Sequence, residues 1–292
     1  MNQFFRSVKN YLSLVRFSHT VFAMPFALIG FTLAVTEENQ HFSLRLLLLV
    51  ILCMIFARNA AMGFNRIADR RIDALNPRTK NREIPSGTVS VTAATLFVII
   101  NAALFIATTG FINLLTLSLS PVALAVIFGY SLSKRITPLS HFILGLGLSL
   151  APIGAYVAVT GYFNIMPVIF SIIVITWVSG FDIIYALQDD AFDRSNKLYS
   201  LPSVAGKKTS IIISVIVHLI TFVLVLTAGF IGKGGTFYWI GAGIFTILLI
   251  YQHSIVKADD ISRVTLAFGT TNGIASIFFA FFTILDLILR SN

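Results

Sequence analysis

Apolar stretches of 17 or more residues recur along the whole 292-residue chain, separated by short polar segments. A helix of about 20 mostly apolar residues crosses the hydrocarbon core of a bilayer. Because lipid offers no hydrogen-bond partners, such runs indicate an all-α, polytopic membrane protein. We expect nine transmembrane helices, at about residues 18–36, 44–63, 91–110, 112–130, 139–160, 164–187, 210–230, 236–256 and 264–289.

The connections between these helices predict one domain, residues 1–292, with its function on one side of the membrane. The connections at about 64–90 and 188–209 are long, whereas those on the other side are mostly tight. The N-terminus and the loops on the side of the long connections hold 17 of the 21 Lys and Arg residues. By the positive-inside rule we expect a cytoplasmic N-terminus, an outer C-terminus and an active site that faces the cytoplasm of a bacterial inner membrane.

The composition narrows the function further. Charged residues make up 11% of the chain, against about a quarter in soluble domains. The net charge of +9 follows from the basic loops, so we do not expect nucleic acid binding. The single Cys53 excludes a disulfide or a cysteine zinc site, and the five histidines follow no metal-binding spacing. No small-residue cleavage site follows the first apolar run, which we interpret as a retained helix.

The stretch FNRIADRRIDALNPRTKNREIPSG, residues 64–87, concentrates charge in a chain that has little. Asn65, Asp69 and Asp73 recur every four residues, so they face one side if the apolar helix before them continues. Such oxygen ligands suit a hard cation, and the surrounding basic residues suit an anion. A metal-bound diphosphate has both requirements.

A second acidic stretch, FDIIYALQDDAFDRSNKLYSLP, covers residues 181–202. Asp189 and Asp193 share a helical face, with Asp182 and Tyr185 one to two turns earlier on nearly the same face, and Asp190 is adjacent. Two facing carboxylate ladders could hold two or three Mg²⁺ ions on one diphosphate. The simpler alternative is that charges collect in cytoplasmic loops, but it does not explain why each ladder begins where an apolar helix ends.

Two further groups of polar residues bear on this site. Arg58 and Asp182 lie about two turns inside apolar helices, where charges are costly and mark a site or cavity; a structural Arg58–Asp182 ion pair is the alternative. Tyr130, Ser131, Lys134 and Arg135 are expected at a cytoplasmic helix end, where they could bind phosphate oxygens. Basic residues after a span are also ordinary membrane topology.

In this order, the three motifs resemble those of the UbiA superfamily of intramembrane prenyltransferases, over essentially the whole chain. The resemblance rests on Asn65-RIA-Asp69-RRI-Asp73 with RTKNREIPSG, on Asp182-IIYALQ-Asp189-DAF-Asp193 and on Tyr130-SLS-Lys134-Arg135. The opening VRFSHTVFAMPFALIGF is similar to hydroxybenzoate-type members. Arg66 departs from the pattern, since many members have an acid there; the chain then has one metal ligand fewer, or Arg66 contacts the diphosphate.

The resemblance implies a nine-helix bundle around a cavity and Mg²⁺-dependent transfer of a polyprenyl group from polyprenyl diphosphate to an aromatic acid. It implies catalytic aspartates Asp69, Asp73, Asp189 and Asp193, which with Asn65 would hold the metal. The expected diphosphate-binding residues are Arg58, Arg66, Tyr130, Ser131, Lys134 and Arg135. The expected acceptor-binding residues are Arg70, Asp182, Tyr185 and Asp190.

Several functions stay open at this point. The opening helix favours 4-hydroxybenzoate as the acceptor, and a naphthoate of a menaquinone route is the nearest alternative. A cation-coupled transporter would place its acids near the bilayer midplane at broken helices, whereas most acids here gather at one face. A non-catalytic structural membrane protein leaves the spacing of the two ladders unexplained.

Overall fold

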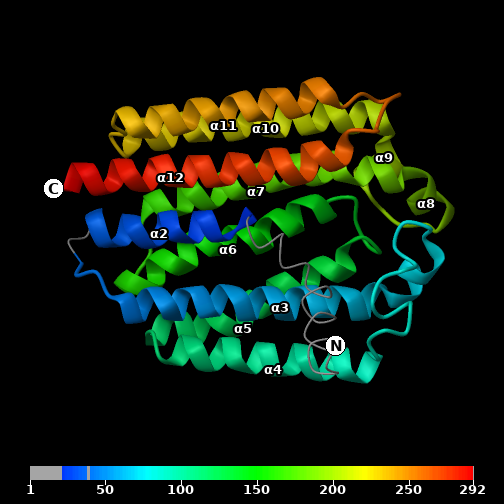
Figure 1. Cartoon of the computed structure of the whole chain (residues 1–292), viewed down its shortest axis with the longest axis horizontal. Helices are drawn as coiled ribbons and strands as arrows, with labels where there is room; N and C mark the ends of the chain where they lie inside the picture. Colours follow the sequence, from blue (N-terminus) through cyan, green and yellow to red (C-terminus); the bar gives the residue numbers. More distant parts are fainter. Residues whose placement is uncertain (1–21, 38–39, 292) are drawn as a thin grey trace, which may run out of the picture.

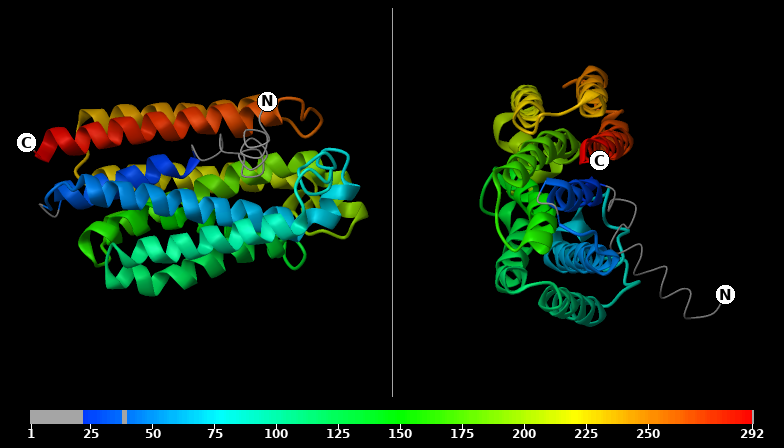
Figure 2. Two further views of the ribbon diagram at one scale, coloured as in Figure 1. Left: turned by 60° about the horizontal axis from the view of Figure 1, so that its bottom comes forward. Right: turned by 90° about the vertical axis from the view of Figure 1, so that its left-hand side faces the viewer.

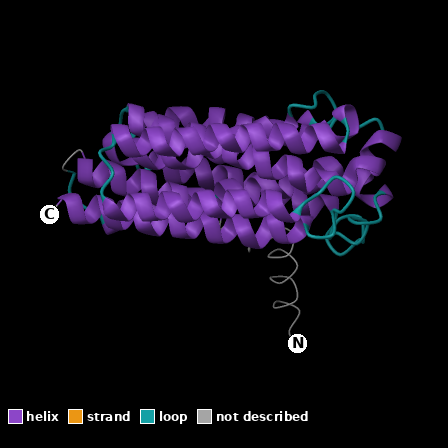
Figure 3. Ribbon diagram, turned by 90° about the horizontal axis from the view of Figure 1, so that it is seen from above, coloured by secondary structure: helices purple, strands orange, loops and turns teal. Residues whose placement is uncertain are grey.

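The computed structural model describes residues 22–37 and 40–291, and every regular element within these ranges is a helix (Figure 3). The long helices are α2 (Met24–Glu37), α3 (Leu44–Leu75), α4 (Val91–Gly110), α5 (Leu114–Ser133), α6 (Ser140–Thr160), α7 (Ile165–Ala186), α10 (Lys207–Ile231), α11 (Thr236–Ile255) and α12 (Asn272–Ser291). The short elements are the 3-10 helix η2 (Leu187–Asp189), α8 (Asp190–Ser195), α9 (Leu201–Ala205) and the π-helix η3 (Leu266–Thr271).

The predicted membrane fold is confirmed. Eight helices in the described ranges are long and apolar enough to cross a bilayer, and α2 is a shorter apolar helix. Together they match the nine expected spans. The predicted start of the first span, at residue 18, and the basic residues of the N-terminus lie outside the described residues.

The helices form a bundle whose long axes run in one general direction (Figure 1). Helices α3, α4 and α5 lie on one side and α10, α11 and α12 on the other, with α2, α6 and α7 between them (Figure 2). Most residues of α7 are buried. Its Trp177 is fully buried and packs against Phe26, Phe181 and Phe245, with ring centroids 5.0–5.8 Å apart. Helix α7 is therefore the centre of the core.

Short polar residues begin several of the helices. The side chains of Ser43, Ser90 and Asn113 accept hydrogen bonds from backbone N–H groups in the first turns of α3, α4 and α5. These caps satisfy donors that the helix itself leaves unpaired. Gly161 follows α6 at φ +76°, a left-handed conformation that glycine adopts without a steric penalty. The tight turn at Gly161, between α6 and α7, agrees with the short connections that the sequence predicts on the side opposite the long loops.

Helix α3 carries the first acidic motif beyond the apolar span. Its 32 residues extend about 48 Å at roughly 1.5 Å per residue, more than the roughly 30 Å of the hydrocarbon core. It ends at Leu75, before Asn76 and Pro77, because a residue that precedes proline avoids helical geometry. The expected helical register of Asn65, Asp69 and Asp73 is therefore confirmed.

The second motif differs from the expected single helix. Helix α7 ends at Ala186, and the 3-10 turn η2 separates it from α8. Asp189 ends η2, whereas Asp193 lies in α8. A 3-10 turn has three residues per turn rather than 3.6, so it changes the directions of the side chains that follow.

Both acidic motifs lie at the same end of the bundle. The loop 76–90, α8 and α9 gather at the right of Figure 1, and the long loops are at one end in Figure 3. The C-terminus lies at the opposite end. This arrangement agrees with the expected alternation of the loops.

Candidate active site

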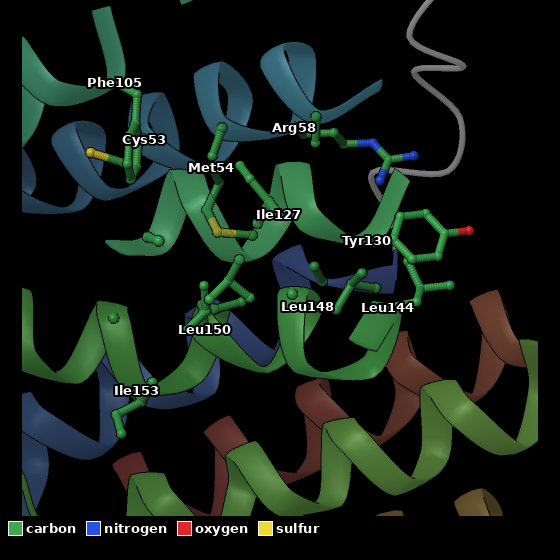
Figure 4. A pocket seen from close by; sticks show the side chains of 18 of the residues that line it. Cys53, Met54, Arg58, Phe105, Ile127, Tyr130, Leu144, Leu148, Leu150 and Ile153 are labelled. Atoms are coloured by element: carbon green, nitrogen blue, oxygen red, sulfur yellow. The ribbon is translucent and has the colours of Figure 1, made fainter. Parts of the chain in front are cut away.

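A cavity of about 540 Å³ lies in the half of the bundle built from α2 to α7, with Phe268 of η3 in its wall. Its lining is predominantly apolar, and the polar lining residues of the two motifs and their neighbours are Arg58, Asn65, Arg66, Arg82, Tyr130, Asp182 and Tyr185. In Figure 4, Arg58 and Tyr130 lie together, whereas Cys53 and Phe105 lie farther along the cavity. The cavity thus joins a charged region to an apolar one.

The first acidic motif is neutralised by basic residues from two loops. The amide of Asn65 donates to Asp69 at 3.0 Å, and Arg135 lies 3.3 Å from the other oxygen of Asp69. Arg82 donates to both oxygens of the buried Asp73, at 2.7 and 2.9 Å. Both contacts come from one guanidinium nitrogen, Nη1, and hydrogen bonds between charged groups of this kind are short and strong. Both carboxylates are held in fixed orientations.

The second motif binds the loop that follows the first. Asp189 accepts hydrogen bonds from Arg78, one of them at 3.0 Å from Nε, and from Asn76 at 3.1 Å. Arg78 also donates to the hydroxyl of Tyr185 at 2.9 Å, and its guanidinium lies over the Tyr185 ring. The structure therefore brings the ends of α3 and α7 together, and a shared metal site between the two aspartate ladders stays a prediction.

Lys134 lies among the carboxylates of both motifs. Burial alone would lower the pKa of its ammonium, but Tyr130, Asp182, Asp193 and Asp189 outweigh burial and raise this pKa above its ordinary value. Asp69 of the first motif interacts with the same ammonium. Lys134 therefore stays protonated at neutral pH, as an anion site requires.

Some predicted site residues lie away from the cavity wall. Ser131 is buried, and its hydroxyl has no hydrogen-bond partner. Arg70 donates to the carbonyl of Ile67 on its own helix at 2.8 Å, and Asp190 pairs with Arg194 at 2.8 Å. None of these three lines the cavity. The same holds for the remaining predicted metal and phosphate residues, Asp69, Asp73, Lys134, Arg135, Asp189 and Asp193, and the roles of all of these residues stay predictions.

Arg66 and Arg58, by contrast, both line the cavity. Arg66 is almost fully buried, with Nε 3.8 Å from a carboxylate oxygen of Glu83. The Nε of Arg58 is buried without a hydrogen-bond partner. The alternative Arg58–Asp182 ion pair is wrong, because Asp182 pairs with His141 at 2.7 Å instead.

Three functional contacts were not expected from the sequence. Arg78 and Arg82 lie within the charged stretch 64–87, so their proximity to the aspartates was visible but their partners were not. His141 ends the GYSLSKRITPLSH motif, and the histidines of the chain follow no metal-binding spacing. No spacing rule links it to Asp182, which is 41 residues away.

The donor set decides which metal could bind here. In the part of the chain that the structure describes, no three His, Cys, Asp or Glu side chains enclose a single ion. Mg²⁺ does not need such a cage, because it commonly takes one or two carboxylates and completes its shell with waters and substrate phosphates. The buried Oδ2 of Asp193 has no partner, and all expected ligands are oxygens. The residues therefore fit a magnesium ion that the substrate helps to hold.

Residues 23–283 match the model of the UbiA prenyltransferase family. The chain belongs to this family. It is therefore an intramembrane prenyltransferase, which sets aside the transporter and the non-catalytic structural alternatives. The match covers both acidic motifs, the basic motif after α5 and the cavity wall.

Individual relatives extend the comparison. A 4-hydroxybenzoate octaprenyltransferase of Aliivibrio fischeri (strain MJ11) is 28% identical over 238 residues, which are 80% of this chain and 81% of the relative. The apo structure of a UbiA homologue from Aeropyrum pernix K1 is 28% identical, with a TM-score of 0.80 over 93% of this chain and 98% of the other. A UbiA homologue from Archaeoglobus fulgidus, solved bound to DMAPP and Mg²⁺, is 20% identical and shares the fold, with a TM-score of 0.74 over 96% of this chain and 99% of the other.

Proposed function

We propose that this prenyltransferase moves a polyprenyl group from polyprenyl diphosphate to the ring of a hydroxylated aromatic acid, 4-hydroxybenzoate, in quinone biosynthesis. One observation carries the proposal. The cavity is apolar along most of its wall and polar to charged where Tyr130, Arg58 and Arg66 line it, close to two joined aspartate motifs. A polyprenyl diphosphate has a matching shape, with a long apolar hydrocarbon tail and a charged diphosphate at one end.

The diphosphate would bind at the charged end. Arg58 and Arg66 line the cavity there, and Lys134 and Arg135 adjoin the aspartates. Guanidinium groups bind phosphate oxygens through paired hydrogen bonds, and an ammonium adds a compact charge. Tyr130, which lines the cavity, could donate its hydroxyl to the same anion, and Ser131 completes the proposed diphosphate-binding set.

Magnesium would be held by Asn65, Asp69, Asp73, Asp189 and Asp193. When bound, Mg²⁺ supplies positive charge that stabilises the diphosphate as it leaves. Three of these aspartates pair with arginines, so the site holds basic groups that would lie close to a bound diphosphate. The relative from Archaeoglobus fulgidus, solved bound to DMAPP and Mg²⁺, supports this assignment.

The acceptor would lie between the diphosphate and the second motif. Asp182 and Tyr185 line the cavity, and a carboxylate beside a phenol hydroxyl can orient the ring and raise its electron density. The ring carbon next to that hydroxyl attacks the allylic carbon, the bond to the diphosphate breaks, and the ring then loses a proton. Arg70 and Asp190 complete the proposed acceptor-binding set, although they lie away from the wall.

The apolar wall of the cavity would also protect the positive charge that forms on the prenyl group during transfer. Positive charge develops on the allylic carbon as the diphosphate leaves, and water would quench it. Phe105, Phe181 and Phe268 line the cavity, and aromatic faces stabilise cations. A dry wall also strengthens every charge interaction inside it.

The enzyme would work from the inner leaflet. The basic loops indicate that the end with α8, α9 and the loop 76–90 faces the cytoplasm, with the C-terminus outside in a bacterial inner membrane. Water-soluble acceptors and magnesium would enter from that side, and the hydrocarbon tail from the lipid.

Product analysis tests the proposal. Purified protein is incubated with one polyprenyl diphosphate, Mg²⁺ and a set of aromatic acids that includes 4-hydroxybenzoate and a dihydroxynaphthoate, and each product is identified by mass. We expect prenylated 4-hydroxybenzoate. A product formed from the naphthoate alone would replace the proposed acceptor, and a protein that consumes no prenyl diphosphate with any acid would overturn the proposed function.

A further inference from the structure

A hydrogen-bonded pair of buried side chains, His141 and Asp182, lies beside the cavity. His141 is the second residue of α6 and is fully buried, whereas Asp182 belongs to α7 and lines the cavity. The imidazole Nδ1 lies 2.7 Å from Oδ2 of Asp182. The ammonium of Lys134 also interacts electrostatically with this carboxylate.

The other ring nitrogen of His141 fixes the direction of that hydrogen bond. The backbone N–H of Leu201, at the start of α9, donates to Nε2 at 3.3 Å. A ring nitrogen that accepts a hydrogen bond carries no proton, so a neutral imidazole here carries its proton on Nδ1. His141 therefore donates to Asp182, and the carboxylate is the acceptor.

The pair also connects the second acidic motif to the loop that follows it. Leu201 follows Ser200, and the neighbouring Tyr199 donates its N–H to the carbonyl of Lys134 at 2.7 Å. The N–H of Leu198 in turn donates to the carbonyl of Asp193 at 2.9 Å. The imidazole of His141 thus bonds both to Asp182 and to the segment that follows Asp193.

We propose that His141 is a positioning residue for prenyl transfer, which holds Asp182 as an oriented carboxylate toward the aromatic acceptor. The inference rests on the proposed function and adds to it a residue that does not touch the substrate. Orientation by a buried partner limits the rotation of the carboxylate and keeps one oxygen free for the acceptor hydroxyl. Loss of the hydrogen bond should harm acceptor use and leave the diphosphate site intact.

Two substitutions separate positioning from packing. His141→Leu removes both hydrogen bonds, whereas His141→Gln keeps one donor and one acceptor in a side chain of similar reach. With purified protein, we expect His141→Leu to lower kcat/KM for the aromatic acid about 10- to 100-fold, the scale for loss of a hydrogen bond to a charged group. The KM for prenyl diphosphate should stay within about twofold, and His141→Gln should recover most of the activity.

A matched control uses the other half of the bundle. His218 is also buried, and its ring bonds to His253 at 2.8 Å and to the carbonyl of Trp177 at 3.0 Å. His218→Leu removes an imidazole of equal burial without touching the cavity wall, so kcat/KM for the acid should stay near the wild-type value. Equal losses in both leucine variants, or a Gln variant as inactive as Leu, would overturn the positioning role.

The tautomer gives a readout that does not depend on activity. Nuclear magnetic resonance of protein labelled with ¹⁵N-histidine, assigned by difference from His141→Gln, should show a proton on Nδ1 of His141 and none on Nε2. A proton on Nε2 would overturn the inference even if the enzyme is active. A wild-type protein that transfers no prenyl group would instead overturn the function on which the inference rests.

Discussion

Arg78 donates hydrogen bonds to Asp189 and so joins the loop after α3 to the turn after α7. The two residues are 111 positions apart in the chain. The same guanidinium also contacts Tyr185, whose ring stacks on Phe268 of η3 at a centroid distance of 4.1 Å. One arginine therefore connects both acidic motifs with the wall of the cavity.

Arg78→Leu should lower kcat/KM at least about 10-fold, because Asp189 and Tyr185 lose a shared charged partner. Arg71 on the same face of the membrane is exposed, and Arg71→Leu serves as the control. Steady-state kinetics with both substrates measure the effect. Equal activity of the two variants would show that the connection between the motifs is not needed.

Asp69→Ala and Asp193→Ala should each reduce prenyl transfer by more than about 100-fold, because each removes an oxygen ligand from the proposed metal site. The proteins should still insert in the membrane, since the apolar spans are unchanged. Asp260 is exposed, so Asp260→Ala should retain full activity. Wild-type turnover by either the Asp69 or the Asp193 variant would count heavily against the metal site.

The binding of prenyl diphosphate should stay nearly constant from about pH 7 to 9.5. The pKa of Lys134 lies above its ordinary value, and an unperturbed lysine loses its charge near 10.4. A group with a raised pKa keeps its proton to higher pH, so the attraction to the anion persists. A fall in affinity with a midpoint near pH 9 would contradict the assigned environment of Lys134.

Gly154→Phe should shift donor preference toward shorter prenyl diphosphates. Gly154 lines the cavity, and a Cβ atom there meets no other atom within 4 Å, so a larger side chain can enter the space of the tail. We expect kcat/KM for a long-chain donor to fall at least about 10-fold relative to geranyl diphosphate, as a change of pocket size allows.

Gly243 provides the matched control for this substitution. It is also a helical glycine with no atom near its Cβ position, but it lies on α11, outside the cavity wall. Gly243→Phe should leave donor preference unchanged. A long-chain preference that survives Gly154→Phe would exclude this part of the cavity as the site of the tail.

The sequence predicted the features that local physics controls. The thickness of a bilayer sets the length of apolar runs, so the spans could be located from composition. The four-residue spacing of Asn65, Asp69 and Asp73 predicted a helical face because α3 continues without a break to Leu75. The positions of both motifs at one end of the bundle followed from the alternation of the loops.

The ion-pair partners of the site aspartates could not be predicted from the sequence. Asp73 pairs with Arg82 and Asp182 with His141 because of packing between separate elements, and sequence spacing carries no such information. The 3-10 turn at η2 is equally hidden, since the residues before Asp189 are ordinary helix formers. Tertiary contacts decided these details.

The most direct test measures the binding of geranyl thiolodiphosphate, a donor analogue that reacts slowly, to purified wild-type protein and to the Asp69→Ala and Asp193→Ala variants. Each protein is measured with Mg²⁺ and after treatment with EDTA. We expect tight binding only for wild-type protein with Mg²⁺, lost with EDTA and restored by added Mg²⁺. Binding by either variant as tight as that of the wild-type protein would contradict a shared magnesium–diphosphate site between the two aspartate motifs. Wild-type binding that is equally tight with Mg²⁺ and with EDTA would contradict it as well.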